Sequence, residues 1–253
     1  MAVPIIFSAL LGMALGSFLS VVAHRLPLGL SIVAPRSRCP QCETQIAARD
    51  NLPVLSYLLL RGRCRHCGER IPARYPLLEL GLGAVFVASL LVFWDEPGEI
   101  VLAWAFAMTL ATITLTDLEH RLIPNLVLIP SAAAGLLIIA LSDSDGLPEH
   151  LIAAAAAFGA LFLIALIKPQ GMGMGDVKLA GVMGLYLGRA VAPALLFAFA
   201  SGALFGLILI ARHGPEARKH QVPFGPFLAF GGIVGLFVGD EIADWYTDSF
   251  FSS

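Results

Sequence analysis

Charge is scarce in this 253-residue sequence, of which only 13% is Asp, Glu, Lys or Arg and 58% is hydrophobic. A soluble domain of this length normally carries about twice that proportion of charge. The formal net charge of −2 gives no electrostatic basis for binding nucleic acid. Long repeats and low-complexity tracts are missing too, apart from the alanine run 153–157. We therefore expect an all-α protein that crosses a membrane several times.

About eight apolar runs are long enough, or nearly long enough, to span the hydrocarbon core of a bilayer, which takes about 20 helical residues. Spans of this composition should be helices, because irregular backbone cannot face lipid. The sixth run is short and its ends are the least well defined. The predicted spans are residues 3–23, 77–94, 100–116, 125–141, 151–167, 177–188, 191–211 and 224–239.

Basic residues are distributed unevenly between the segments that join these spans. If all eight runs cross, segment 24–76 lies on the same side as the polar segments after the third, fifth and seventh spans. With Lys178, that side holds 15 of the 16 Lys and Arg residues, and only Arg189 lies opposite. The positive-inside rule makes this side cytoplasmic and both termini external. Because His24 and Arg25 follow the first run and no basic residue precedes it, we expect a retained anchor rather than a cleaved signal.

Cysteine is also rare, and all four cysteines lie in the polar segment 24–76. They form two Cys-x-x-Cys pairs separated by 21 residues, a spacing close to that of zinc-ribbon sites. A segment this short buries little core of its own, so a metal held by four thiolates would order it. Free thiols, two disulfides and a redox motif are the alternatives, and His66 offers a substitute ligand. The predicted metal ligands are Cys39, Cys42, Cys64 and Cys67, holding a structural Zn²⁺.

Two aspartates lie next to apolar runs, where a carboxylate is expensive and therefore a candidate functional group. Asp117 follows the third span, and Asp176 precedes the sixth within the glycine-rich segment 171–179. In the predicted topology both lie at the cytoplasmic boundary. Facing each other across a water, two such carboxylates would hold one proton between them, which is the state an aspartic protease needs.

Glycines surround Asp176 at positions 171, 173 and 175. Without a Cβ they allow unusual backbone dihedrals and the close approach of an extended substrate, so we predict that Gly173 and Gly175 line the substrate strand. Alternatively, the glycines form a tight loop before a helix that Asp176 caps. Similar spacings of small residues, Gly12 with Gly16 and Gly231 with Gly235 and Gly239, predict close helix packing.

Taken together, these motifs resemble those of the bacterial type IV prepilin peptidases, which are membrane aspartyl proteases of the GxGD class. The resemblance covers nearly the whole chain, with small departures at Ser20 and His24. The matching segments are GSFL (16–19) with RLP (25–27), RSRCPQC (36–42), NLPVLSY (51–57), residues 64–67 with RYPLLEL (74–80), residues 117–124, GMGDVKL (173–179) and PFGPF (223–227).

The resemblance implies cleavage of the leaders of type IV prepilins and type II secretion pseudopilins, at the cytoplasmic face of the bacterial inner membrane. It assigns catalysis to Asp117 and Asp176. It also implies N-methylation of the new N-terminus with S-adenosylmethionine, an activity associated with the four-cysteine segment. Glu79 and Gly83 match positions linked to methyl transfer, although Glu79 has the alternative of pairing with Arg74.

The resulting expectation is a first transmembrane helix at 1–23, a methyltransferase-associated four-cysteine segment at 24–76 and a seven-helix membrane peptidase core at 77–253. A peptidase that does not methylate remains an alternative. So does an ion-coupled transporter, because paired intramembrane acids also mark ion routes, although a carrier has no evident need for four cysteines. A structural assembly protein with buried aspartates is a third alternative.

Overall fold

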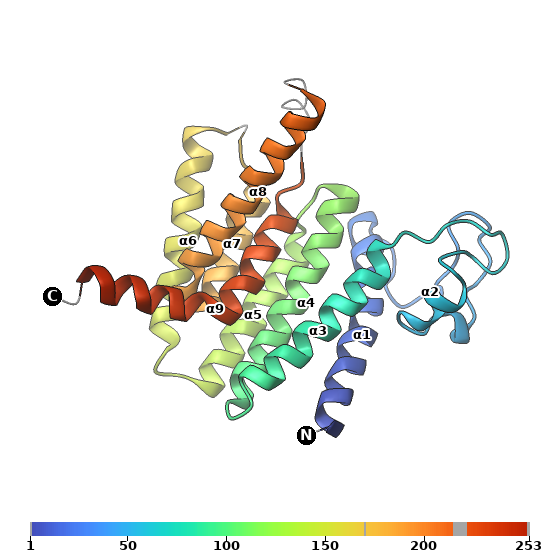
Figure 1. The fold of residues 1–253 in the computed structure, drawn as a ribbon, viewed down its shortest axis with the longest axis horizontal. Helices are drawn as coiled ribbons and strands as arrows, with labels where there is room; N and C mark the ends of the chain where they lie inside the picture. The colour runs from blue at the N-terminus through green and yellow to red at the C-terminus, as the bar shows by residue number, and fades with distance from the viewer. Residues whose placement is uncertain (1, 170, 215–221, 252–253) are drawn as a thin grey trace. The chain divides into compact units, whose positions relative to one another are not determined.

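The computed structural model describes residues 2–169, 171–214 and 222–251. The described residues form helices joined by loops, and extended pairing within them is limited to two isolated β-bridges (Figure 1). The α-helices are α1 (Ala2–Arg25), α2 (Leu55–Leu59), α3 (Arg74–Val92), α4 (Pro97–His120), α5 (Asn125–Ser142), α6 (Leu147–Ile167), α7 (Met174–Leu187), α8 (Val191–His213) and α9 (Gly225–Phe251). Short 3-10 helices are η1 (Leu26–Leu28), η2 (Ala48–Asp50) and η3 (Gly188–Ala190).

Seven helical stretches among the described residues are long and apolar enough to cross a membrane. Six are built on α1, α3, α4, α5, α6 and α9, and the seventh, Met174–His213, contains both α7 and α8. With 14 residues, α7 is only about 21 Å long against a hydrocarbon core of about 30 Å, so the sixth run is short as expected. The all-helical, multi-pass fold is confirmed. Residues 215–221 of the predicted polar segment 212–223 lie outside the described ranges.

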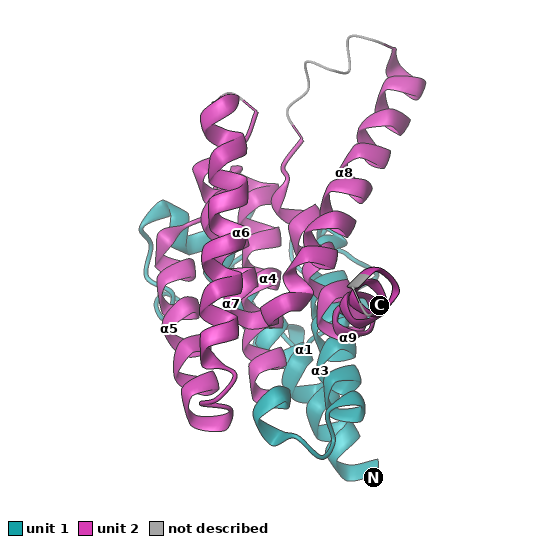
Figure 2. Ribbon diagram, turned by 90° about the vertical axis from the view of Figure 1, so that its left-hand side faces the viewer, with its two compact units in different colours: residues 1–100 teal, residues 101–253 magenta. Residues whose placement is uncertain are grey.

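The chain divides into two compact units, Met1–Ile100 and Val101–Ser253 (Figure 2). In the first unit α1 packs along α3. The helices meet at small residues: a Cβ on Gly12 would lie 2.8 Å from the Cα of Gly83, and one on Gly16 would lie 2.9 Å from the Cα of Glu79. Such separations leave no room for a side chain, so the predicted close packing of this glycine pair is confirmed.

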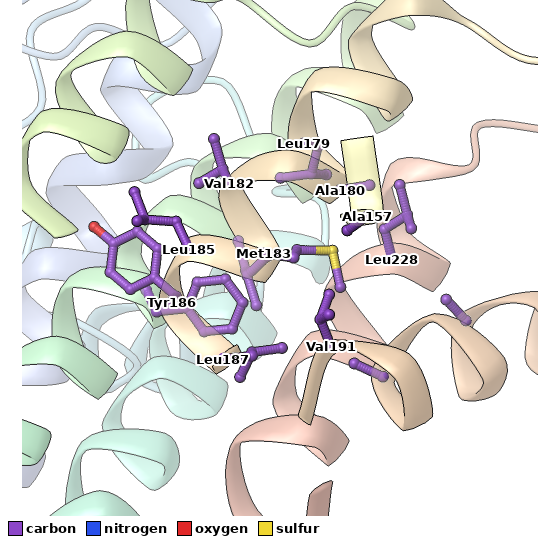
Figure 3. Packing of buried hydrophobic residues seen from close by; sticks show 14 of the residues in the cluster. Ala157, Leu179, Ala180, Val182, Met183, Leu185, Tyr186, Leu187, Val191 and Leu228 are labelled. Carbon is purple, nitrogen blue, oxygen red and sulfur yellow. The ribbon is translucent and has the colours of Figure 1, made fainter. Parts of the chain in front are cut away.

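In the second unit α7 lies in the centre of the hydrophobic core. Leu179 and Met183 of α7 are fully buried. They belong to one apolar cluster with Ala157 of α6, Val191 of α8 and Leu228 of α9 (Figure 3). Because α7 is surrounded by three other helices, its first turn has a fixed position, and this turn carries Asp176.

Helices α8 and α9 are held together by facing rows of small residues. Cβ atoms on Gly231 and Gly235 would lie 2.2 Å from the carbonyl oxygen of Ala194 and 2.6 Å from its Cβ, respectively. A Cβ on Gly239 would lie 2.6 Å from the Cβ of Ala190. The four-residue spacing of the glycines thus meets a four-residue spacing of alanines, and the predicted packing face is confirmed.

Buried hydroxyl groups join α4, α5 and α7 inside this apolar unit. Thr109 and Ser131 share a hydrogen bond of 2.7 Å between their Oγ atoms, and the hydroxyl of Tyr186 donates to the Ser131 carbonyl oxygen at 2.8 Å. Polar groups in a low-dielectric interior are costly unless paired, so this network favours a single arrangement of the three helices. It helps to fix α4 relative to α7, the helices that carry the two aspartates.

The last helix is longer than predicted. The sequence places the end of the span at residue 239, whereas α9 continues to Phe251. Arg189 of η3 bonds Asp240 at 3.1 Å and Asp244 at 2.6 Å. These acids are one helical turn apart on α9, and their ion pairs with Arg189 hold the added turns against η3.

Candidate active site

Asp117 lies in the last turn of α4, where it is 6% exposed. Its Oδ2 accepts a buried hydrogen bond of 2.7 Å from the backbone N–H of Gly225, the first residue of α9. The helix ends immediately afterwards, because Arg121 takes a positive φ of 53° while its N–H bonds the Asp117 carbonyl oxygen. The carboxylate is therefore fixed between the end of one helix and the beginning of another.

Asp176 lies in the first turn of α7 and is partly exposed. Its Oδ2 accepts a hydrogen bond of 3.3 Å from the N–H of Gly173, the residue that caps the helix. The capping alternative raised by the sequence is thus observed. Capping leaves the carboxylate accessible, and it lies within electrostatic range of Asp117. The two acids, 59 positions apart in the sequence, come together in one compact unit.

Ile123 and Gly175 bring the two acidic segments into contact. Ile123 is buried, and a Cβ added to Gly175 would lie 2.8 Å from the Cβ of Ile123. A side chain at position 175 would push the first turn of α7 away from the segment that follows Asp117. The glycine is therefore explained by close approach.

The expectation of unusual dihedrals in the glycine-rich segment is wrong. Gly173 has φ −74° and ψ 143°, which is ordinary extended backbone, and neither Gly171 nor Gly175 has a φ in the left-handed region. The segment turns into α7 without needing conformations reserved for glycine. What it requires at Gly173 and Gly175 is space, since a Cβ on Gly173 would lie 3.0 Å from Asp176 Oδ2.

Gly225 is a site residue that sequence reasoning missed. From the sequence, the PFGPF segment contributes only to the resemblance. The signal was nevertheless present: a glycine between two prolines at a helix start indicates backbone that must approach another group closely. The sequence could not identify that group, because Asp117 is 108 positions away.

An open apolar groove of about 380 Å³ lies between α5, α6 and α7, but it is a separate feature. It is lined on α7 by Lys178, Gly181, Val182 and Leu185, and neither aspartate belongs to it. At 100° per residue these positions lie on the side of α7 opposite Asp176. The ammonium group of Lys178 instead donates to Asn125 Oδ1 at 3.1 Å, which joins α7 to the start of α5.

The four cysteines form a cluster that can hold a metal ion. Their Sγ atoms all lie within 4.8 Å of one another, and those of Cys39 and Cys67 are 3.8 Å apart. Four thiolates at the usual Zn–S distance of about 2.3 Å stand about 3.8 Å apart at the corners of a tetrahedron. None of the four is in a disulfide, and exposed His66 is not among the clustered ligand atoms. The donor set and the spacing therefore fit zinc.

Both Cys-x-x-Cys pairs have the same local backbone structure. The N–H of Glu43 bonds the Cys39 carbonyl at 2.9 Å, and the N–H of Gly68 bonds the Cys64 carbonyl at 3.0 Å. Glu43 and Gly68, which follow the second cysteine of each pair, both take positive φ. One β-bridge closes each turn. Two equivalent turns thus present their thiols to a common centre, as in a zinc ribbon.

The acidities of the thiols suit a bound cation. Hydrogen bonds from the side chain and backbone of Thr44 lower the pKa of Cys42 to about 6. For Cys67, the hydrogen bond from the Glu69 backbone lowers the pKa, but burial and hydrogen bonds with the other thiols outweigh it and raise the pKa to about 12. A bound cation favours the thiolate form of every sulfur in such a cluster.

Glu79 and Gly83, the predicted methyl-transfer positions, lie on the face of α3 that meets α1. A Cβ on Gly83 would lie 2.9 Å from the side chain of Met13, so this glycine contributes to helix packing. Glu79 is 8% exposed, and its Oε2 accepts the N–H of Val54 at 2.7 Å. Val54 has φ 60° and ψ −49°, which is strained for a β-branched residue. Glu79 therefore holds a strained point of the four-cysteine segment against α3.

Comparison with known proteins finds sequence matches over nearly the whole chain. Residues 10–93 match the model of the bacterial peptidase A24 N-terminal domain, and residues 104–210 match that of the type IV leader peptidase family. A prepilin leader peptidase/N-methyltransferase of Bacillus subtilis (strain 168) is 38% identical, covering 93% of this chain and 94% of the relative. The proteins of that name from Aeromonas salmonicida (strain A449) and Stutzerimonas stutzeri are 35% and 32% identical. These two matches cover 94% and 96% of this chain, respectively, and 91% and 93% of the relatives' lengths. No solved structure matches the chain.

The fold defines the class, a multi-pass helical membrane protein with two acidic residues brought together at helix ends. The matches over nearly the full length of chain and relatives define the family. The chain belongs to the type IV leader peptidase family.

Proposed function

We propose that this chain removes the leaders of type IV prepilins and type II secretion pseudopilins and then N-methylates the new N-terminal residue. The observation that carries the proposal is the convergence of Asp117 and Asp176 in one compact unit of a chain that belongs to the leader peptidase family. The names of the relatives, prepilin leader peptidase/N-methyltransferase, support both activities.

In the proposed cleavage step the two carboxylates share one proton. The ionised carboxylate takes a proton from a water molecule, whose oxygen attacks the scissile carbonyl carbon. The protonated carboxyl group donates its hydrogen bond and then its proton to the carbonyl oxygen. Collapse of the tetrahedral intermediate breaks the C–N bond, and the amine leaves with a proton from the site. The partial exposure of Asp176 gives water and substrate access, and the exposed backbone at Gly173 offers an edge for the substrate strand. Gly175 contributes by letting the first turn of α7 pack against Ile123.

The site faces the cytoplasm, and the host membrane is the bacterial inner membrane. Support comes from the distribution of basic residues: Arg121 lies four positions after Asp117, and Lys168 lies shortly before the first turn of α7. Fifteen of the 16 Lys and Arg residues are on this side of the predicted topology. A prepilin with its basic leader in the cytoplasm would present the scissile bond at this boundary.

One assay tests both activities. The detergent-purified protein is incubated with a prepilin and isotopically labelled S-adenosylmethionine, and the product is analysed by mass spectrometry. Loss of the leader together with label on the new N-terminus is the expected result. Leader loss without label would leave the alternative of a peptidase that does not methylate, and an intact prepilin would refute the proposal.

For methyl transfer we propose S-adenosylmethionine as the donor, which when bound supplies an electrophilic methyl group to the free amine. The role of Glu79 is to hold Val54, and through it the four-cysteine segment, against α3. Its carboxylate acts here as a hydrogen-bond acceptor, and an amide oxygen can accept the same bond. Gly83 contributes by allowing α1 to pack closely on α3.

The Glu79 proposal predicts different outcomes for two substitutions. Glu79→Ala, which leaves the Val54 N–H without its acceptor, is expected to lower methylation at least about tenfold, because a lost hydrogen bond to a charged group costs about 1.5–3 kcal/mol. Leader cleavage should stay within about twofold. Glu79→Gln should retain most methylation. Gly81→Ala on the same helix, where a Cβ meets nothing within 4 Å, is the control. Equal loss in the Gln and Ala variants would show that the carboxylate itself is required.

We further propose that the four cysteines bind one structural Zn²⁺ and that it orders the segment 24–76. Zinc analysis of the purified protein is expected to give about one ion per chain. Cys39→Ser should lose most of the zinc, because it removes one of four thiolates. His66→Ala is the matched control: it changes a potential ligand between Cys64 and Cys67 but should leave the zinc content unchanged. A folded, active wild-type preparation free of zinc would contradict the assignment.

A further inference from the structure

The starting observation is that the two carboxylates receive unequal support from backbone N–H groups. The bond from Gly225 to Asp117 is 2.7 Å long and buried, whereas the bond from Gly173 to Asp176 is 3.3 Å long and exposed. Hydrogen bonds to an ionised carboxylate are typically 2.7–2.9 Å, and about twice as strong as neutral ones. Only the bond to Asp117 falls in this range.

The donor belongs to the first turn of α9, whose N–H groups have no partners within the helix. The Phe224 carbonyl accepts the N–H groups of Phe227 and Leu228, which makes Gly225 the first helical residue. Pro226 has no N–H to offer. Asp117 therefore supplies the cap for Gly225 from another helix.

The same contact explains why position 225 is glycine. A Cβ there would lie 2.7 Å from Asp117 Oδ2 and 3.1 Å from both Cβ and Cγ of Asp117. These atoms belong to a short side chain on a packed helix and cannot move aside without taking the carboxylate out of position. Gly225 thus fixes where the carboxylate lies as well as which hydrogen bond it accepts.

We propose that Gly225 is a positioning residue that orients Asp117 and stabilises its negative charge, so that Asp117 is the base that takes the proton from water. The shared proton then resides on Asp176, which donates to the substrate carbonyl oxygen. This assignment of roles rests on the proposed function, since it presupposes that both aspartates take part in cleavage. The proton lost by water passes to Asp117, and the proton lost by Asp176 passes to the carbonyl oxygen, so the step is balanced.

The first test compares Gly225→Ala with Gly159→Ala, a helical glycine whose added Cβ would meet nothing within 4 Å. Displacing a catalytic group by about 1 Å can cost about 100-fold in rate, so kcat for prepilin cleavage should fall about 100-fold in Gly225→Ala. KM for prepilin and methylation of an already cleaved pilin should stay within about twofold of the Gly159→Ala values. The acid limb of the kcat–pH profile should move to higher pH by about one unit, since the charge on Asp117 loses its donor. A packing role alone would lower thermal stability and both activities together without moving that limb.

A second measurement leaves Gly225 unchanged, so it can be made even if Gly225→Ala does not fold. Amide hydrogen exchange of a peptide covering residues 222–230 is followed in wild type, Asp117→Ala and Asp176→Ala. Faster exchange in Asp117→Ala alone is expected, because only that substitution removes the acceptor of the Gly225 N–H. Unchanged exchange in Asp117→Ala, or cleavage by Gly225→Ala at the Gly159→Ala rate with an unmoved acid limb, would overturn the inference. Failure of the proposed function looks different: Asp117→Asn would then cleave prepilin as wild type does.

Discussion

Replacing either Asp117 or Asp176 with Asn is expected to abolish leader cleavage, with kcat lowered by about 10³-fold or more. Asn is nearly isosteric with Asp, and its amide oxygen can still accept the N–H of Gly225 or Gly173. It cannot take or give a proton, and positioned proton transfer contributes about 10² to 10⁴-fold for each group. The loss should therefore appear in kcat while KM for prepilin changes little. Initial rates of leader removal, measured by gel shift across prepilin concentrations, provide both constants.

Methylation is the internal control for this prediction. Each Asn variant is given a pilin from which the leader has already been removed, and labelled methyl incorporation is expected at the wild-type rate. That result would show that the protein is folded and that the defect is confined to cleavage. Wild-type cleavage by either variant would remove that aspartate from the mechanism.

The second large effect concerns stability and lies where α8 meets α9. Gly231→Ala is expected to destabilise the protein by about 2–3 kcal/mol, because the new Cβ would lie 2.2 Å from the Ala194 carbonyl oxygen and 2.8 Å from the Ala198 N. The backbones must separate for it to fit, since the Ala194 oxygen and the Ala198 nitrogen are both backbone atoms. Separation would also disturb the start of α9, which carries Gly225. Cleavage activity should therefore fall along with the thermal transition temperature in detergent.

Gly206→Ala on α8 is the matched control, because its added Cβ would meet nothing within 4 Å. Alanine is a better helix former than glycine by about 1 kcal/mol, so this variant should be as stable as wild type or slightly more stable. A loss of stability in Gly231→Ala together with an unchanged or increased stability in Gly206→Ala would distinguish the effect of packing from that of helix propensity. Equal melting temperatures for the two variants would contradict the tight α8–α9 contact.

Apolar patterning was sufficient to predict the fold class, because a chain with so little charge has few ways to satisfy its backbone other than membrane helices. Close helix packing was also predictable where small residues recur every four positions, as at Gly12 and Gly16. The extent of α9 was not predictable: its added turns begin with two acids that pair with Arg189, more than 50 positions away in the sequence. Local sequence contains no information on such a partner.

The candidate site was also predictable only in part. Asp117 and Asp176 stood out because charge is costly beside apolar runs, and the cysteines because their spacing repeats. Gly225 was missed because its function depends on a contact made only in the folded chain. That Gly175 lines the substrate strand stays a prediction; its backbone has no left-handed φ, and the constraint seen at this position comes from the Ile123 side chain. Glycines that allow close approach cannot be distinguished from glycines that allow a turn until the neighbouring residue is known.

The central claim is that Asp117 and Asp176 act as one catalytic unit, and a double-mutant cycle in kcat tests it most directly. Single-turnover cleavage of a prepilin is measured for wild type, Asp117→Asn, Asp176→Asn and the double variant. Residues that work as a unit are strongly non-additive, so the double variant is expected to cleave no more slowly than the slower single variant. Losses that multiply in the double variant would show that the two aspartates act independently, which would contradict the account.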